Sequence, residues 1–262
     1  MVLTHHASSG IRGTGYIFKN LKEVSLFLIR SLETEALSLQ NVFMARIARV
    51  VLPGIPHHVT QRGVRSLPVF FSDHDRAIYL HLLAEQGKRC GLAFLAWCLM
   101  TNHVHLIAVP NETNSLARGI GEAHRRYTRM INFREEVRGH LFQERFFSCP
   151  LDEQHLFAAV VYILRNPVRA GLAREATAYR WSSTRWFLGL VKTDPLVEDL
   201  GPLSDIADRR DFLRSDPAQI DTLREHTRSG RPCGDDEFVF SAERITGRKL
   251  KKRRPGRKPK EK

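Results

Sequence analysis

The spacing of apolar residues divides the middle of the chain into regular predicted elements. β-branched residues between turn residues predict a first strand over about 56–62. Residues 73–88 repeat apolar positions at helical spacing between an aspartate and two glycines, which predicts a helix. A continuous apolar run predicts a buried strand over 92–100, and a short Thr-Asn turn leads into a second strand that begins at His103.

The same patterning continues to about residue 164. It predicts a capped helix over about 115–133, a strand over 141–149 and a helix that begins near Asp152, whose carboxylate complements the helix dipole. The order is β-α-β-β-α-β-α, and its first six elements predict an α+β, ferredoxin-like split βαβ sheet with helices on one face. The other face of the sheet is then open to a ligand unless the last helix covers it.

The pattern weakens on both sides of this block, which divides the chain into four predicted regions. Residues 1–43 are interpreted as an N-terminal extension or as the product of a mis-called start, because nothing links them to the pattern that follows. Residues 44–190 are the main predicted domain, and residues 191–247 are predicted to form a small helical appendage. Residues 248–262 are predicted to be a disordered basic tail.

Charge narrows the range of partners. The formal net charge of +13 favours a polyanionic partner, either nucleic acid or an acidic membrane surface. Ten Lys and Arg against one Glu in residues 248–262 give that segment +9, which leaves only +4 for the rest of the chain. No apolar run reaches the roughly 18 residues that a membrane helix needs, and the four cysteines lack metal-site or disulfide spacing. We therefore expect a cytoplasmic protein with no membrane partner.

Candidate chemistry lies in two short segments. His103 and His105 are two residues apart on a predicted strand, so their imidazoles project from the same face and form half of a divalent-metal site. Tyr162 and Asn166 share one helix face, and Pro167 places the Asn166 carboxamide at the helix end. Two imidazoles, an amide oxygen and a phenol suit a metal-assisted nucleophilic site. The simpler alternative is two hydrogen-bonded strand histidines and a core tyrosine.

At these residues the chain resembles a known family. His103-Val104-His105 is similar to the HUH motif (His, bulky hydrophobic, His), and Tyr162 in YILRNPVRAGL is similar to the tyrosine motif of single-tyrosine transposases. Five segments, in order, further resemble the REP-associated tyrosine transposases: MAR from Met44, HVTQRG from His58, MTNHVHL from Met100, GHLFQERF from Gly139 and YRWSS from Tyr179. The resemblance covers about residues 44–190.

The resemblance implies metal-dependent cleavage of single-stranded DNA at or beside a hairpin, through a covalent 5′-phosphotyrosine intermediate and a free 3′-OH. By motif matching, Tyr162 is the nucleophile, His103 and His105 are metal ligands, and Asn166 takes the place of the third ligand. Imidazole and amide oxygen suit Mn²⁺, with Mg²⁺ the expected cellular ion. The implied fold is of the HUH endonuclease type, with an added tyrosine-bearing helix, in a nucleoid-associated monomer or homodimer.

Basic residues around this site are candidates for binding DNA phosphates, although a charged helix side is often only solvated. They are Arg62, Arg65, Arg165 and Arg169 near the site, Arg125, Arg126 and Arg129 on one helix face, and Arg257 and Lys258 in the tail. Two other functions stay open. One is a catalytically silent protein that binds hairpin DNA or RNA on the same fold, and the other is a metal-dependent hydrolase of a small phosphate.

Overall fold

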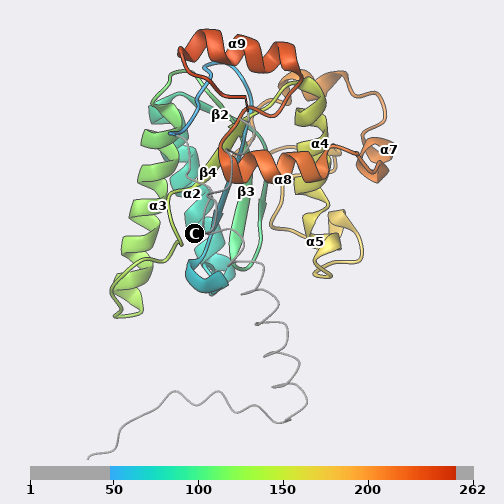
Figure 1. Cartoon of the computed structure of the whole chain (residues 1–262). Helices are drawn as coiled ribbons and strands as arrows, with labels where there is room; N and C mark the ends of the chain where they lie inside the picture. The colour runs from blue at the N-terminus through green and yellow to red at the C-terminus, as the bar shows by residue number, and fades with distance from the viewer. Residues whose placement is uncertain (1–47, 252–262) are drawn as a thin grey trace, which may run out of the picture. The chain divides into compact units, whose positions relative to one another are not determined.

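A computed structural model describes residues 48–251 of the chain (Figure 1). Contacts divide the chain into two units, residues 1–45 and 46–262, and every described residue belongs to the second. The predicted extension over 1–43 lies outside the described residues, as do Arg257 and Lys258 of the basic tail. The predictions for residues 1–43 and 252–262 therefore stay predictions. The first residues of the predicted disordered tail do pack on the domain, because Leu250 is buried and Arg248 donates to the carbonyl oxygens of Ala48 and Arg49.

Four antiparallel strands form the central sheet. They are β1 (His57–Arg62), β2 (Leu92–Leu99), β3 (His103–Pro110) and β4 (Phe147–Pro150). The spatial order is β2-β3-β1-β4, so the two strands next to each other in the middle are the first and third in the sequence. This is the strand order of a split βαβ sheet, and the predicted α+β, ferredoxin-like fold is confirmed.

Two long helices cover the first face of the sheet. They are α2 (Asp73–Cys90) and α3 (Ser115–Arg134), which lie side by side (Figure 1). Ser72 and Asp75 form a capping box at the start of α2, and the Asp75 carboxylate also pairs with Arg134 at the end of α3. Apolar residues of alternate sheet positions, such as Val59 and Leu106, pack with the two helices into the larger core cluster.

The second face of the sheet is covered as well. Helix α4 (Glu153–Leu164) packs on β2 and β3, and helix α8 (Ile220–Ser229) packs on β4 and β1 (Figure 1). Asp152 caps α4 by accepting a hydrogen bond from the His155 backbone N–H. Ile107, Cys149 and Leu223 belong to the buried cluster between this face and its helices. The sequence pattern predicts that this face is open unless the last predicted helix covers it. In the structure, two helices, α4 and α8, cover it.

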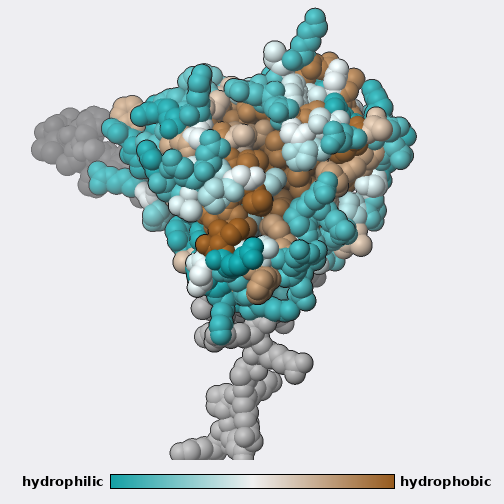
Figure 2. Space-filling view, turned by 90° about the horizontal axis from the view of Figure 1, so that it is seen from above, coloured by the Kyte–Doolittle hydropathy of each residue, from teal (hydrophilic) through white to brown (hydrophobic). Residues whose placement is uncertain are grey.

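The remaining elements are short, except for one further helix near the end of the described chain. They are η1 (Val64–Ser66), α5 (Asn166–Arg169), η2 (Ala176–Ala178), α6 (Thr184–Phe187), η3 (Gly201–Asp205), α7 (Arg209–Arg214) and α9 (Asp236–Thr246). Ala242 of α9 packs with Val50, Leu52 and Leu250 in a small third cluster. Figure 2 looks down on this end of the molecule and shows hydrophobic residues near the middle of the face, with hydrophilic ones around them.

Two sequence-based expectations differ from the structure. Helix α8 comes from the region predicted to be an appendage, yet it packs directly on the sheet. The strand predicted over 141–149 is shortened to β4, because the pairing shifts by two residues. Continuing the β1–β4 register would place Glu144 opposite Gly63, but Gly63 bridges Phe142 instead. The Gln61 amide donates to the Glu144 carbonyl oxygen at 2.7 Å, which stabilises the looped segment.

Candidate active site and nucleic-acid interface

The sheet places the two motif histidines side by side on its second face. In the β1–β3 register, His103 lies opposite Arg62 and His105 lies opposite Thr60. Strand alternation gives His103, His105 and Ile107 the same face, and Ile107 is buried beneath the second-face helices. The ring centroids of His103 and His105 are 5.0 Å apart. The paired imidazoles predicted from the spacing therefore lie on the face that α4 and α8 cover.

Tyr162 reaches the same place from α4. Its ring centroid is 5.4 Å from that of His105 and 6.1 Å from that of His58 on β1. Because α4 packs on β2 and β3, the helix carries the phenol to the histidine strand. The structure thus brings together residues that are far apart in the sequence.

Two arginines flank the Tyr162 side chain. The Arg169 guanidinium carbon is 4.0 Å from the ring centroid, and its Nη2 donates to the Tyr162 carbonyl oxygen at 2.7 Å. The Arg224 guanidinium carbon is 5.3 Å from the same centroid, and its side chain hydrogen-bonds the phenol. Sequence reasoning placed Arg169 near the site but missed Arg224, because α8 lies in the weakly patterned region and has no motif. Two cations in this position can stabilise negative charge on a phenol or phosphate oxygen.

Among the candidate residues, two polar side-chain atoms are buried without a hydrogen-bond partner in the described part of the chain: His105 Nε2 and Asn166 Nδ2. Asn166 begins α5, directly after Arg165 at the end of α4. A buried polar atom left unpaired costs roughly 1–3 kcal/mol, so a bound ion or ligand that satisfies it is stabilised. A half-turn of the carboxamide exchanges its nitrogen and oxygen, so the Asn166 side chain can present an acceptor at this position.

These donors fit a divalent ion, although the set is small. In the described part of the chain, no three His, Cys, Asp or Glu residues gather as a metal cluster. An ion at this site would therefore depend on two imidazoles and the Asn166 amide. That nitrogen and oxygen set is compatible with Mn²⁺ and, with water completing the shell, Mg²⁺.

Burial keeps the histidines of this region neutral. It lowers the pKa of His58 to about 3 and that of His103 to about 4, and it holds the pKa of His105 well below its usual value. The nearby Arg62 guanidinium lowers the His103 pKa further. Neutral imidazole is the form that binds metal, so burial favours the protonation state that a metal site at these histidines would need near neutral pH.

Two other buried histidines make the fold sensitive to acid. Burial lowers the pKa of His57 to about 4 and that of His124, which hydrogen-bonds Tyr79, to about 3. A histidine whose folded pKa is lowered contributes stability above its unfolded pKa near 6.5, and that stability is lost as the pH falls toward the folded value. We expect each such group to reduce the unfolding free energy by about 2 kcal/mol between pH 6.5 and 5.

Urea unfolding at pH 7 and pH 5 measures this loss. His74 is exposed, so the His74→Gln variant should show the same difference between the two pH values as the unaltered protein. Equal unfolding free energies at pH 7 and pH 5 would contradict the expectation.

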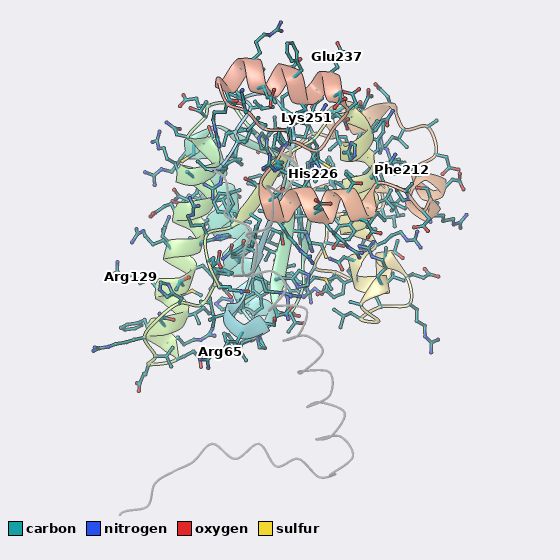
Figure 3. All side chains as sticks on the ribbon, in the orientation of Figure 1. Arg65, Arg129, Phe212, His226, Glu237 and Lys251 are labelled. Atoms are coloured by element: carbon teal, nitrogen blue, oxygen red, sulfur yellow. The ribbon has the colours of Figure 1, made fainter. Side chains whose placement is uncertain are left out.

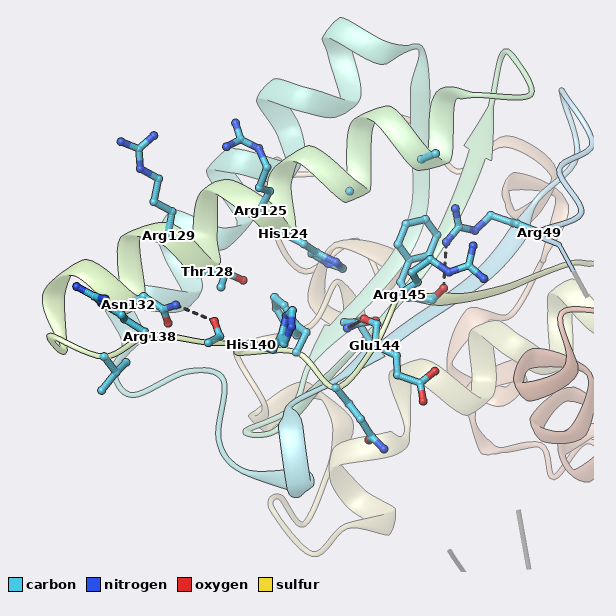
Figure 4. Close-up of a pocket in the computed structure, with 18 residues that line it drawn as sticks. Arg49, His124, Arg125, Thr128, Arg129, Asn132, Arg138, His140, Glu144 and Arg145 are labelled. Carbon is cyan, nitrogen blue, oxygen red and sulfur yellow. Dashed lines mark hydrogen bonds between the residues drawn. The ribbon is translucent and has the colours of Figure 1, made fainter. Parts of the chain in front are cut away.

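A basic groove lies on the first face of the sheet. It is a cavity of about 1030 Å³ between α3 and the segment 137–146 (Figure 4). Its lining includes the arginines Arg49, Arg125, Arg129, Arg138 and Arg145, together with His124, His140 and Glu144. Sequence reasoning identified Arg125 and Arg129 from one helix face; the other arginines come from the looped segment and from a residue before β1. The concentration of arginines suits a polyanion.

The other predicted DNA-binding arginines lie in different surroundings. Arg126 is outside the groove lining and pairs with Glu85 at 2.7 Å. Arg165 donates to the backbone oxygens of Arg214 and Ser215, so it holds the segment after α7 against the end of α4. Arg65 lies in η1, at the end of the molecule where β1 finishes (Figure 3).

Residues 57–166 match the family model described as transposase IS200-like, a range that includes His103, His105, Tyr162 and Asn166. No curated protein matches the chain. In the described residues, no helix is long and apolar enough to cross a membrane.

Two similar solved structures are a REP-associated tyrosine transposase bound to a REP hairpin and a candidate transposase from Deinococcus radiodurans R1. The first is 16% identical, with 60% of this chain and 93% of the other covered and a TM-score of 0.47. The second is 14% identical, with 49% and 95% covered and a TM-score of 0.33. The family match covers residues 57–166, less than half of the chain, and over this range the chain is similar to the IS200-like transposase family.

Proposed function

We propose that this protein cleaves and rejoins single-stranded DNA at REP-like hairpins, with Tyr162 as the nucleophile. A divalent ion, Mg²⁺ or Mn²⁺, would be held by His103, His105 and Asn166. The observation that carries the proposal is the position of the Tyr162 ring, 5.4 Å from the ring of His105, whose buried Nε2 has no hydrogen-bond partner in the described residues.

The reaction needs one bond to form and one to break. The Tyr162 phenolic oxygen bonds to the scissile phosphorus, and the bond from phosphorus to the 3′ oxygen breaks. The phenol loses its proton and the departing 3′ oxygen gains one, which leaves a 5′-phosphotyrosine and a free 3′-OH. The phosphoester bond is retained, so a 3′-OH of another DNA end can attack it and reverse the step.

The residues around Tyr162 assist this step electrostatically. Arg224 hydrogen-bonds the phenol and Arg169 lies over its ring, so both can stabilise the negative charge that develops between the attacking oxygen and the phosphate. The divalent ion, when bound, supplies polarisation of the scissile phosphate.

The basic groove supports a nucleic-acid substrate. Its arginines come from α3, from the looped segment and from Arg49, which precedes β1 in the chain, so separate segments contribute positive charge to one groove. Phosphate contacts of this kind give affinity that falls with salt. The groove lies on the face of the sheet opposite Tyr162, so in this proposal the hairpin is bound on one face and cleaved on the other.

Removing the groove charges should weaken hairpin binding without affecting the metal site. For the double variant Arg129→Ala, Arg138→Ala, we expect lower affinity and a salt slope smaller by about one for each DNA phosphate that the protein no longer binds. Fluorescence anisotropy with a labelled hairpin across a salt series measures both. Arg126→Ala is the matched control because Arg126 pairs with Glu85 outside the groove. Equal salt slopes for all three proteins would contradict a role for the groove.

Incubation of the unaltered protein with a REP-like hairpin and Mn²⁺ tests the proposed function itself. The expected result is a protein–DNA adduct that survives a denaturing gel. Binding without any adduct would favour a catalytically silent hairpin-binding protein instead. Turnover of a small phosphate ester without an adduct would favour the hydrolase.

A further inference from the structure

We propose that Thr227 on α8, acting through His58, fixes the tautomer of His105 and so leaves the Nε2 lone pair of His105 free for the divalent ion. Thr227 is therefore a positioning residue. The inference rests on the proposed function in one respect, which is that His105 holds the ion.

Three hydrogen bonds link α8 to the histidine. Thr227 Oγ1 donates to the Leu223 carbonyl oxygen at 2.7 Å. His58 Nδ1 lies 2.8 Å from Thr227 Oγ1, and His58 Nε2 lies 3.0 Å from His105 Nδ1. The side chains of Thr227, His58 and His105 are all buried, with 2–5% of their surface exposed. Bulk water therefore does not compete for these bonds.

The proton of the Thr227 hydroxyl determines which atom donates and which accepts in each of these hydrogen bonds. Thr227 gives that proton to Leu223, so its oxygen can only accept from His58. The proton of neutral His58 is then on Nδ1, and its Nε2 is an acceptor. His105 must therefore donate from Nδ1, which leaves Nε2 with a lone pair.

The ring nitrogen that makes none of these hydrogen bonds, His105 Nε2, is the atom that we assign to the divalent ion. His105 Nε2 is buried and has no hydrogen-bond partner among the described residues. With the chain reversed, Nε2 would carry a proton, which would be a buried donor without an acceptor and could not bind a cation. Cys149 lies 3.3 Å from Thr227 Oγ1, and its thiol can donate to the remaining lone pair without altering this order.

The hydrogen bonds from Thr227 link α8 to two histidines that lie within the range matched by the family model. His58 and His105 lie within residues 57–166, whereas Thr227 lies well beyond them. Helix α8 packs on β4 and β1, which brings Thr227 to His58. Arg224, nearly one turn earlier on α8, hydrogen-bonds Tyr162 from the same helix. Helix α8 therefore places Thr227 against His58 and Arg224 against Tyr162.

The test compares two threonines that make the same local bond. Thr246 on α9 donates to the Ala242 carbonyl oxygen at 2.7 Å, as Thr227 does to Leu223, but it is not among the partners of the site histidines. Thr227→Val and Thr246→Val thus remove equivalent hydroxyls. Long-range proton–nitrogen spectra of the full-length, metal-free protein with ¹⁵N-labelled histidine show which ring nitrogen of His105 carries the proton.

In the unaltered protein and in Thr246→Val, we expect the His105 proton on Nδ1. In Thr227→Val, we expect a new population with the proton on Nε2, and Thr227→Ser should restore the original spectrum. Titration calorimetry with Mn²⁺ should show a 10- to 100-fold loss of affinity in Thr227→Val, about the usual effect of removing a partner of a metal ligand. Thr227→Ser and Thr246→Val should bind as the unaltered protein does.

Two results would overturn the proposal. One is an unaltered protein whose His105 proton is on Nε2, and the other is a Thr227→Val variant that keeps both the Nδ1 proton and its Mn²⁺ affinity. Failure of the proposed function looks different. An unaltered protein with the Nδ1 proton and tight Mn²⁺ binding, but no covalent adduct with DNA, would contradict strand cleavage and still support the role of Thr227.

Discussion

The Tyr162→Phe variant is expected to form no covalent DNA adduct while it still binds the hairpin. The substitution keeps the ring that lies 5.4 Å from the His105 ring, and it removes only the hydroxyl that bonds to Arg224. Loss of one partly buried hydrogen bond changes the unfolding free energy by about 1 kcal/mol, so the fold should be kept. A denaturing gel after incubation with Mn²⁺ measures the adduct, and anisotropy measures binding.

Tyr179→Phe is the matched control for this variant. The Tyr179 hydroxyl donates to the Leu99 carbonyl oxygen at 2.7 Å, and the ring is also partly buried on the second face of the sheet. Its removal should leave the adduct unchanged. An adduct in Tyr162→Phe at the level of the unaltered protein would show that another residue is the nucleophile.

Removal of the divalent ion is expected to have a comparably large effect. Chelation should abolish the adduct, and added Mn²⁺ or Mg²⁺ should restore it. In His105→Ala, addition of either ion should fail to restore it, because the buried Nε2 that we assign to the ion is absent. Calorimetry should show an Mn²⁺ affinity that is lower by at least about 10- to 100-fold. Losing only the hydrogen-bond partner of a metal ligand already has an effect of that size.

His74→Ala controls for the loss of a histidine, since His74 lies on the exposed side of α2. It should bind Mn²⁺ and form the adduct as the unaltered protein does. A His105→Ala variant that keeps its Mn²⁺ affinity and a chelator-sensitive adduct would place the ion elsewhere.

The sequence predicted the sheet and the shared strand face of His103 and His105, because short-range rules determine both. Strand alternation is sufficient to place His103 and His105 on one face, and the register with β1 then follows from the fold. The rule fails between residues 141 and 146, where the strand loops out. Gln61 donates to the Glu144 carbonyl oxygen in the looped segment, and because the two residues are far apart in the sequence, no local pattern predicts this contact.

The contribution of α8 could not be predicted from the sequence. Thr227 and Arg224 carry no motif, and their importance depends on which face of the sheet the helix covers. Similarly, nothing in the α3 sequence separates Arg129, which lines the groove, from Arg126, which pairs with Glu85 on the neighbouring helix. Contacts between distant elements decide these roles.

Mass spectrometry of the protease-digested DNA adduct identifies the nucleophile directly. We expect the peptide that contains Tyr162 to carry the nucleotide, joined through a 5′ phosphate to the phenolic oxygen. A nucleotide attached to any other residue would contradict the assignment of Tyr162. The absence of a covalent adduct on a hairpin that the protein binds with Mn²⁺ present would contradict strand cleavage itself.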